Sequence, residues 1–376
     1  MNFAFSEEQE AFRETLRRFL EEKSPSAEVF RLMETAEGYD PAAWKQMAEE
    51  LGLQGVHVPE AYGGQGFGFL ELGIVLEEMG RTLVCTPYFS SACLATNAVL
   101  NAGSEEQRAA LLPGLASGET IGTLALLEPG GDWDPAGVAL AYARDGDQFL
   151  LSGSKSCVTD GATADLLVVA ARRPGSRAAD GVTLFTVRGD AKGLAAAPVD
   201  PLDATRKLAS LEFSGVRAEL LGVEGEALAA LAKTLDQACA CLALESTGGA
   251  ERCLRSAVDY AKQRVQFGRP IGSFQAVKHK CAEVLLELES ARSAAYYASC
   301  MASEDSGELP LAASLAKACC GDAFLRAAAE NIHIHGGVGF TWESDAHLYY
   351  KRAKANEALF GTPAFHRRRI AELLGF

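Results

Sequence analysis

The sequence lacks any hydrophobic run that approaches the length of a membrane span, and its start, MNFAFSEEQE, has no basic flank followed by an apolar core. We therefore expect no membrane insertion and a cytoplasmic location. The ten cysteines include no CxxC pair, which favours reduced core thiols over disulfides or a zinc site. His333 and His335 are two residues apart and precede Gly-Gly, which is poor geometry for a metal, so no metal site is expected.

Positive charge is also scarce. The chain has 35 Lys and Arg against 50 Asp and Glu, which gives a formal net charge of -15. Such a chain repels phosphate backbones, so nucleic acid is not an expected partner. At 376 residues with 48% hydrophobic content, it is long enough for a globular protein of two or three domains.

The residue pattern is helical, then β, then helical again, which predicts an α+β fold with domains at 1–121, 122–223 and 224–376. Ser6 and Gln9 form a capping-box start for the first helix. Asp145-Gly146 is a good hairpin turn within the β region. Short strands are expected at Phe149–Leu151, Leu166–Val169, Val182–Val187 and Leu211–Val216. From Glu226 onward, long Ala-, Leu- and Glu-rich helices are expected to break at 267–272, 306–310 and 335–339.

One carboxylate interrupts an apolar stripe in the third region. The stripe recurs at three- and four-residue steps and therefore lies on one helix face; its members are Leu228, Leu231, Leu235, Ala238, Leu242, Glu245, Gly249 and Cys253. Turning an acid toward a core costs several kcal/mol (roughly 2 or more) unless it is paired, protonated or facing a cavity. Glu245 is therefore either paired with an arginine on a neighbouring helix or present for a chemical purpose.

Three long segments carry a resemblance to a known family. PEAYGGQGFG from Pro59, RVQFGRPIGSFQAVKH from Arg264 and IHGGVGFTWESDAHLYYKRA from Ile334 resemble the acyl-CoA dehydrogenase family, and the order of domains does so as well. The resemblance implies a small β-barrel domain between an N-terminal helical domain and a C-terminal helical bundle. It also implies bound FAD, an acyl-CoA substrate, an electron-transfer flavoprotein as electron acceptor, and a tetramer.

The resemblance assigns cofactor contacts residue by residue. Arg264 ends a helix before a turn and offers a fixed cation to a pyrophosphate, whereas Gly336 and Gly337 let backbone approach a ligand closely. Leu127 falls in a turn that touches the flavin in relatives, and Thr159 falls where relatives place a hydroxyl near the ring. The full predicted cofactor set is Leu127, Thr159, Arg264, Phe267, Gln275, His333, Gly336 and Gly337.

The reaction implied is α,β-dehydrogenation of an acyl thioester, in which a carboxylate takes the α-proton and flavin N5 accepts the β-hydride. Many relatives carry this base in a Tyr-Glu-Gly-Thr stretch, where this chain has Leu359–Thr362 with Phe360 in place of the acid. A second common position falls near Ala238 and Cys239. The segment Glu245–Gly248 resembles a branch that acts on bulky, often steroid side-chain, acyl-CoA substrates, so Glu245 is the predicted base.

Other departures favour a different role for the same fold. Gly131-Asp132-Trp133 replaces a frequent Gly-Ser-Asp, Cys157 replaces a tryptophan, and His333 replaces a glutamine. In some relatives two unlike subunits form an α2β2 tetramer, and one of them has neither complete flavin contacts nor a base. The alternatives are therefore a homotetrameric dehydrogenase, a non-catalytic partner subunit of a heterotetramer, and a flavin oxidase on the same scaffold.

Overall fold

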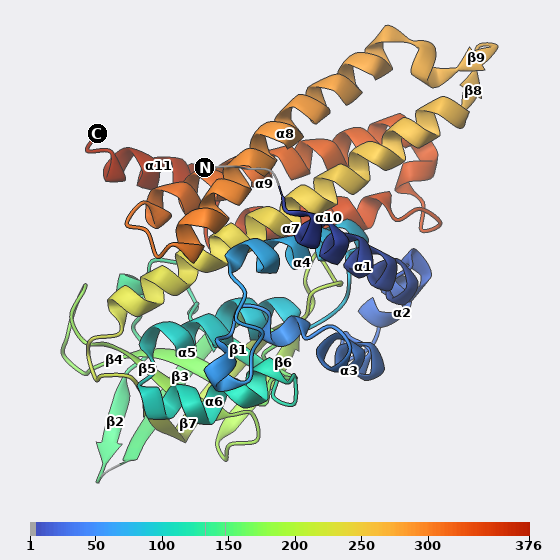
Figure 1. Ribbon diagram of the computed structural model, residues 1–376. Coiled ribbons are helices and arrows are strands. Elements are labelled where there is room, and N and C mark those ends of the chain that lie inside the picture. The colour runs from blue at the N-terminus through green and yellow to red at the C-terminus, as the bar shows by residue number, and fades with distance from the viewer. Residues whose placement is uncertain (1–4, 132, 147) are drawn as a thin grey trace. The chain divides into compact units, whose positions relative to one another are not determined.

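The computed structural model describes residues 5–131, 133–146 and 148–376 (Figure 1). The chain divides into two compact units that interleave along the sequence. The helical unit comprises the chain up to Arg31, Phe69–Val84 and Cys239–Phe376, and the β unit comprises Leu32–Gly68 and Cys85–Ala238. The predicted α+β organisation is confirmed, while the three domain boundaries stay a prediction. Asp132, named above as a departure, lies outside the described residues.

The helical unit is built from long helices joined by short breaks at the predicted places. Its helices are α1 (Glu7–Lys23), α4 (Phe69–Thr82), α8 (Gln275–Ser303), α9 (Leu309–His335), α10 (Ala346–Ala358) and α11 (Pro363–Leu373), and the helices α2 (Ser26–Met33) and α7 (Leu228–Gln263) contribute to both units. Within the unit, α9 packs against α8, α10 and α11, and α4 packs against α1 and α8. The capping box of Ser6 with Gln9 is confirmed at the start of α1. None of the helices among the described residues combines the length and apolar character that crossing a membrane requires.

Glycines allow α4 and α7 to touch through their backbones. A Cβ placed on Gly248 would lie 1.8 Å from the carbonyl oxygen of Glu77, and one on Gly80 would lie 2.0 Å from that of Glu245. No side chain fits there without moving a helix. This contact prevents α7 from sliding along α4 and so fixes the position of Glu245 relative to α4.

We expect Gly248→Ala to lower the free energy of unfolding by about 3 kcal/mol, because overpacking against backbone forces the two helices apart. Gly307→Ala is the matched control, since a Cβ on Gly307 meets no atom within 4 Å. The control should stay within about 1 kcal/mol of the parent chain. Denaturant unfolding of both variants measures the difference, and equal stabilities would show that the helices separate at no cost.

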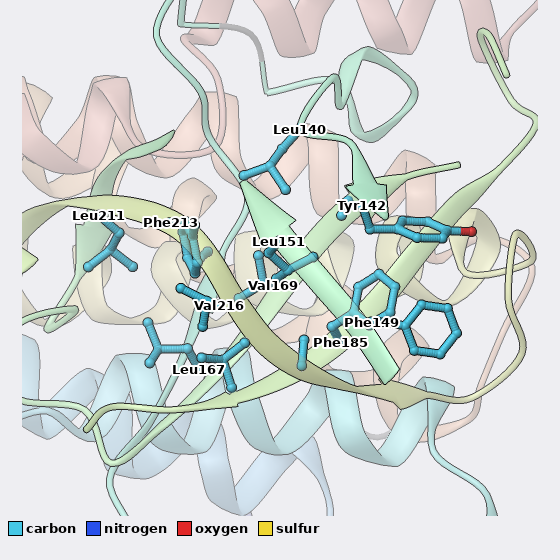
Figure 2. Close-up of a cluster of buried hydrophobic side chains, with 14 of the residues drawn as sticks. Leu140, Tyr142, Phe149, Leu151, Leu167, Val169, Phe185, Leu211, Phe213 and Val216 are labelled. Carbon is cyan, nitrogen blue, oxygen red and sulfur yellow. The ribbon is translucent and has the colours of Figure 1, made fainter. Parts of the chain in front are cut away.

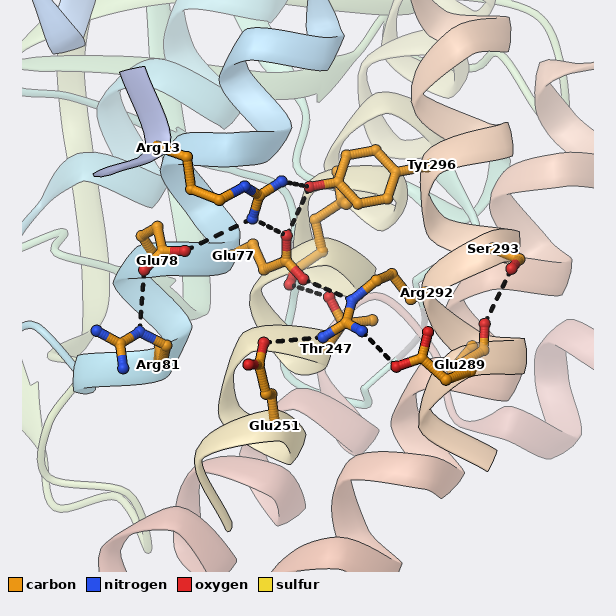
Figure 3. A network of polar contacts seen from close by, with 12 residues as sticks. Arg13, Glu77, Glu78, Arg81, Thr247, Glu251, Glu289, Arg292, Ser293 and Tyr296 are labelled. Carbon is orange, nitrogen blue, oxygen red and sulfur yellow. Dashed lines mark hydrogen bonds and ion pairs between the residues drawn. The ribbon is translucent and has the colours of Figure 1, made fainter. Parts of the chain in front are cut away.

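A buried ionic network crosses the helical unit (Figure 3). Glu77 on α4 is 2% exposed and accepts hydrogen bonds from Arg13 at 2.5 Å, Arg292 at 2.9 Å and Tyr296 at 2.6 Å. Its neighbour Glu78 pairs with Arg13 at 3.5 Å, and with Arg17 and Arg81 at 2.7 and 2.9 Å. Every buried carboxylate named here has a cationic partner, which is the condition under which buried charge is tolerated.

The β unit contains a seven-stranded sheet with the order β1-β4-β5-β7-β3-β2, with β6 paired to β7. Its strands are β1 (Gly122–Ala125), β2 (Tyr142–Asp145), β3 (Gln148–Thr159), β4 (Leu166–Arg172), β5 (Val182–Arg188), β6 (Leu194–Val199) and β7 (Leu208–Leu221). Only the pairing of β1 with β4 is parallel among these seven strands, which the structure describes from Gly122 to Leu221. The helices α3 (Pro41–Glu49), α5 (Thr96–Ala102) and α6 (Glu105–Ala116) complete the unit.

Side chains from the sheet form one buried cluster (Figure 2). Tyr142, Phe149 and Phe185 meet at one end of it with ring centroids 4.9 to 5.5 Å apart, in the tilted and edge-on arrangements that aromatic rings prefer. The long strand β7 pairs with β3 along most of its length, with β6 over its first half and with β5 at its end. Strand β7 therefore joins β3, β5 and β6 into one sheet around this core.

The four predicted strand segments lie inside β3, β4, β5 and β7. Of the predicted hairpin turn, Asp145 is the last residue of β2 and pairs with Gln148, and Gly146 follows it in the connection to β3. The sequence analysis missed β1, β2 and β6. Strand β1 is buried at every position, so its sequence shows no alternation of apolar and polar residues. Strand β6 is rich in alanine and contains Pro198, and both residue types are uncommon in strands. Hydrogen bonding to β7 stabilises β6 as a strand, although the residues of β6 do not favour one.

Candidate functional site

Glu245 lies on α7 inside the helical unit and is 3% exposed. Nη1 of Arg352 on α10 donates to Oε1 of Glu245 at 2.9 Å, and Nδ2 of Asn356 donates to the same oxygen at 3.2 Å. The side chains of Glu245 and Arg352 are both 4% exposed, so the pair is buried on both sides. Of the two possibilities left open by the sequence, the arginine-paired acid fits this geometry.

The pair of Glu245 with Arg352 bears on the predicted role of Glu245 as a base. A general base for an α-proton must present a carboxylate oxygen to the substrate, and burial in an apolar pocket strengthens such a base only when no cation neutralises it. Arg352 and Asn356 hold Oε1 of Glu245 inside the helical unit. Glu245 is therefore a paired carboxylate in this structure, and its assignment as the base stays a prediction.

The turn that follows α10 holds the residue aligned with the usual base of the family pattern. Phe360 is 6% exposed and has φ of 59°, a left-handed conformation that costs a bulky residue about 1 kcal/mol or more. Two buried side chains hold the turn in place. Lys317 donates to the carbonyl of Gly361 at 2.8 Å, and Nε2 of His366 lies 3.1 Å from the carbonyl of Phe360.

Burial lowers the pKa of His366 to about 3, with a further contribution from the charge of Lys317. His366 is therefore neutral near neutral pH and donates its Nε2 hydrogen to the Phe360 carbonyl. Burial also lowers the pKa of Lys317, against the opposing pull of nearby anionic groups. The turn is rigidly defined yet offers no carboxylate, and the other aligned position, Ala238 with Cys239, is buried and apolar.

Six of the predicted cofactor residues lie in the helical unit. Arg264 follows the end of α7 and is exposed, and its guanidinium has no hydrogen bond or ion pair among the residues that the structure describes. Phe267 and Gly268 have φ of 52° and 74° and form the turn of a hairpin between β8 (Val265–Gln266) and β9 (Arg269–Pro270). Phe267 is 91% exposed. Its ring meets Phe274 edge-on at a centroid distance of 6.1 Å, and most of its surface stays in solvent despite the strained left-handed backbone.

The remaining residues of this group surround the end of α9. Gly336 has φ of 63°, and a Cβ added to Gly336 or Gly337 would meet no atom within 4 Å. The space above this backbone is therefore not needed by the packing of the unit itself. Gln275 is exposed at the start of α8. His333 is exposed, and its Nδ1 lies 3.3 Å from Oε2 of Glu330, so its partner in the described chain is an acid.

Leu127 and Thr159 lie in the β unit and are buried at 7% and 3% exposed. The backbone amide of Ser156 donates to the Leu127 carbonyl at 2.8 Å, and the hydroxyl of Thr123 donates to the Thr159 carbonyl at 2.6 Å. A bulge interrupts the pairing of β3 with β7 between Lys155 and Val158, and Cys157 within it has φ of 50°. Bulges re-aim side chains and occur next to active sites.

The sequence analysis missed Arg352, Lys317 and Lys155. Lys155 is fully buried in β3 and shares a face with buried Phe149 and Leu151, so the period-2 pattern could have indicated it, although exposed Gly153 interrupts the alternation. Arg352 and Lys317 could not be found in this way, because long helices carry many lysines and arginines and only tertiary packing selects these two.

Sequence comparisons place the chain within a family. The chain matches models of the three domains of acyl-CoA dehydrogenases in their order along the sequence. The N-terminal domain matches residues 6–119, the middle domain residues 123–216 and the C-terminal domain residues 227–375. The chain therefore belongs to the acyl-CoA dehydrogenase family, a family of FAD-dependent oxidoreductases.

The chain is similar to a sequence relative and to two solved structures over nearly its whole length. The chain is 34% identical over 365 residues to acyl-CoA dehydrogenase IpdE2 of Mycolicibacterium smegmatis, covering 97% of this chain and 98% of that protein. A structure of the steroid ACAD Tcur3481-Tcur3483 matches at 32% identity, TM-score 0.87 and 98% coverage of both chains. The ChsE4-ChsE5 complex from Mycobacterium tuberculosis matches at 26% identity and TM-score 0.89, covering 100% of this chain and 99% of that one.

Proposed function

We propose that this chain is a subunit of an FAD-dependent acyl-CoA dehydrogenase in which a second, unlike chain supplies the α-proton base. The observation that carries the proposal is the Glu245–Arg352 pair, taken together with Phe360 in the turn after α10. The three base positions considered for this chain therefore hold a neutralised acid, a phenylalanine and a buried alanine. The similar structure from Mycobacterium tuberculosis is described as a ChsE4-ChsE5 complex.

The residues of the helical unit fit the adenosine and pyrophosphate parts of FAD. Arg264 offers a cation whose guanidinium has no partner within 5–131, 133–146 and 148–376, the Phe267-Gly268 turn offers backbone, and the open space above Gly336 and Gly337 admits a ligand. In the β unit, Leu127 and Thr159 would line the flavin ring. A bound FAD would supply the hydride acceptor for the β-carbon of the substrate.

The chain's contribution to the reaction is then binding and orientation. Proton abstraction next to a thioester needs a base in contact with the α-carbon and hydrogen bonds to the thioester oxygen. Residues that fix the flavin ring and exclude water can be supplied by this chain even when the base is not. We expect an electron-transfer flavoprotein rather than oxygen to accept the electrons, and oxygen consumption without an acceptor protein would instead indicate a flavin oxidase.

The proposed substrate is an acyl-CoA with a bulky acyl group of the steroid-derived kind. Two points support this: the similarity to a structure described as a steroid ACAD, and Cys157 at the bulge in β3, where the family resemblance leads us to expect a tryptophan. A thiol leaves more room than an indole. The acyl-CoA panel that tests this should include short straight chains and ring-bearing side chains.

A second candidate keeps Glu245 as the base of a homotetrameric enzyme. Its support is the burial of this single acid on an apolar stripe. Because Arg352 and Asn356 hold Oε1 of Glu245, this candidate requires Glu245 to act on the substrate while it is paired.

Purification of the chain alone and together with an unlike acyl-CoA dehydrogenase subunit separates the two candidates. We expect near-stoichiometric FAD and turnover only in the mixed assembly. Arg264→Met in that assembly should weaken FAD binding by about tenfold or more, because a charge-assisted hydrogen bond is lost. Arg255→Met, which removes another exposed arginine of α7, is the control. A yellow, fully active homotetramer would contradict the proposal.

A further inference from the structure

Lys155 presents an unusual arrangement in the β unit. It lies in β3 and is 0% exposed, although an ammonium group in a protein interior costs several kcal/mol, roughly 2 or more, unless it is paired. Its Nζ donates to Oε1 of Glu128 at 2.6 Å and to the carbonyl of Leu126 at 2.9 Å. Burial lowers the pKa of Lys155 to about 8, against the opposing charge and hydrogen bond of Glu128.

Glu128 does more than neutralise Lys155. Its Oε1 accepts from the backbone amide of Leu140 at 2.9 Å, and its Oε2 accepts from that of Ala139 at 3.0 Å. One carboxylate thus ties the start of the connection between β1 and β2 to its end. The Lys155 ammonium holds this carboxylate from the buried side.

The same lysine also fixes the chain just before Glu128. Its hydrogen bond to the Leu126 carbonyl is next to the bond between the Ser156 amide and the Leu127 carbonyl at 2.8 Å. Leu126 and Leu127 are therefore held to two consecutive residues of β3. Thr159 follows four residues after Lys155, and its carbonyl is held by Thr123.

We infer that Lys155 is a positioning residue: through Glu128 and Leu126 it fixes Leu127 and closes the 128–140 segment, and so shapes the face on which the flavin ring packs. The flavin part of this inference rests on the proposed function. Lys155 itself has no role in the chemistry, because its ammonium is enclosed by protein. Its effect is on the order of the segment and on the affinity for FAD.

Backbone amide exchange on the FAD-free chain tests the positioning role. Lys155→Met keeps the length of the side chain and removes its charge, and Glu128→Gln keeps an acceptor for the amides and removes the charge of the carboxylate. We expect both variants to speed exchange at Ala139 and Leu140 by about tenfold or more, while amides in β4 and β5 keep their protection. Lys192→Met is the matched control on the same unit and should change neither.

FAD affinity, measured by flavin fluorescence in the mixed assembly, provides the second readout. We expect Lys155→Met to weaken it by about tenfold, with Lys155→Arg recovering part of the loss. Unchanged exchange at Ala139 and Leu140, or an equal increase throughout the unit, would overturn the positioning role. A parental FAD affinity in a variant whose segment exchanges faster would overturn the link to the flavin. A parent chain that never binds FAD would contradict the proposed function while leaving the exchange result interpretable.

Discussion

Replacing Arg352 by methionine is expected to lower the free energy of unfolding by about 3 to 5 kcal/mol, because it leaves the carboxylate of Glu245 buried without its cation. The ion pair is 2.9 Å long, and both side chains are 4% exposed, so water cannot replace the arginine. Asn356 remains as a neutral donor to Glu245, and a neutral amide does not replace the lost charge. Denaturant unfolding with an unchanged m-value measures the loss.

Two further variants make this result specific. Arg368→Met removes an arginine whose pair with Glu372 is 3.7 Å long and exposed on both sides, so its stability should change by less than about 1 kcal/mol. The double variant Glu245→Leu with Arg352→Met removes both charges and should recover most of the loss. A small effect of Arg352→Met, with no recovery in the double variant, would mean that Glu245 does not depend on this arginine.

Glu77→Gln should also destabilise the chain by about 3 kcal/mol or more near neutral pH, and its effect should depend on acid. Burial alone would raise the pKa of Glu77, but the charges of Arg13 and Arg292 and the hydrogen bond from Tyr296 outweigh it and lower the pKa. A carboxyl whose pKa is lower in the folded state stabilises that state above its unfolded pKa near 4.5, and this contribution is lost as pH falls through the folded value.

The stability of the parent chain should therefore fall more steeply than that of Glu77→Gln as the pH is lowered below about 4.5, and the two curves should converge. Unfolding free energies at a series of pH values measure this. Glu289→Gln is the control, since Glu289 pairs with Arg292 from a half-exposed position. Parallel curves for the parent and Glu77→Gln would contradict the paired, ionised state of Glu77.

The sequence predicted what depends on local pattern. The apolar stripe through Glu245 predicted the helix and the burial of this acid, and Ser6 with Gln9 predicted the start of the first helix. Both predictions succeed because capping and periodicity act within a few residues. The partner of Glu245 could not be predicted, since Arg352 is 107 residues away and is selected by the packing of α10 against the rest of the helical unit. The base assignment depended on that missing contact.

The β unit shows the same limit. Strands with alternating or β-branched residues were found, whereas β6 forms because β7 offers it an edge. Leu127 and Thr159 were predicted from family resemblance, but the lysine that orders their surroundings was not. Its acid partner, Glu128, directly follows Leu127 in the chain, and the contact between Glu128 and Lys155 joins the segment after β1 to β3.

The most direct test of the central claim is the rate of flavin reduction when the active assembly is mixed with acyl-CoA, measured for the parent chain and for Glu245→Gln. If a second chain supplies the base, the two rates should agree within about threefold, even though the variant is less stable. A loss of about 10²-fold or more, the size expected for removal of a general base, in a variant that still binds FAD would contradict the account and return the base to Glu245.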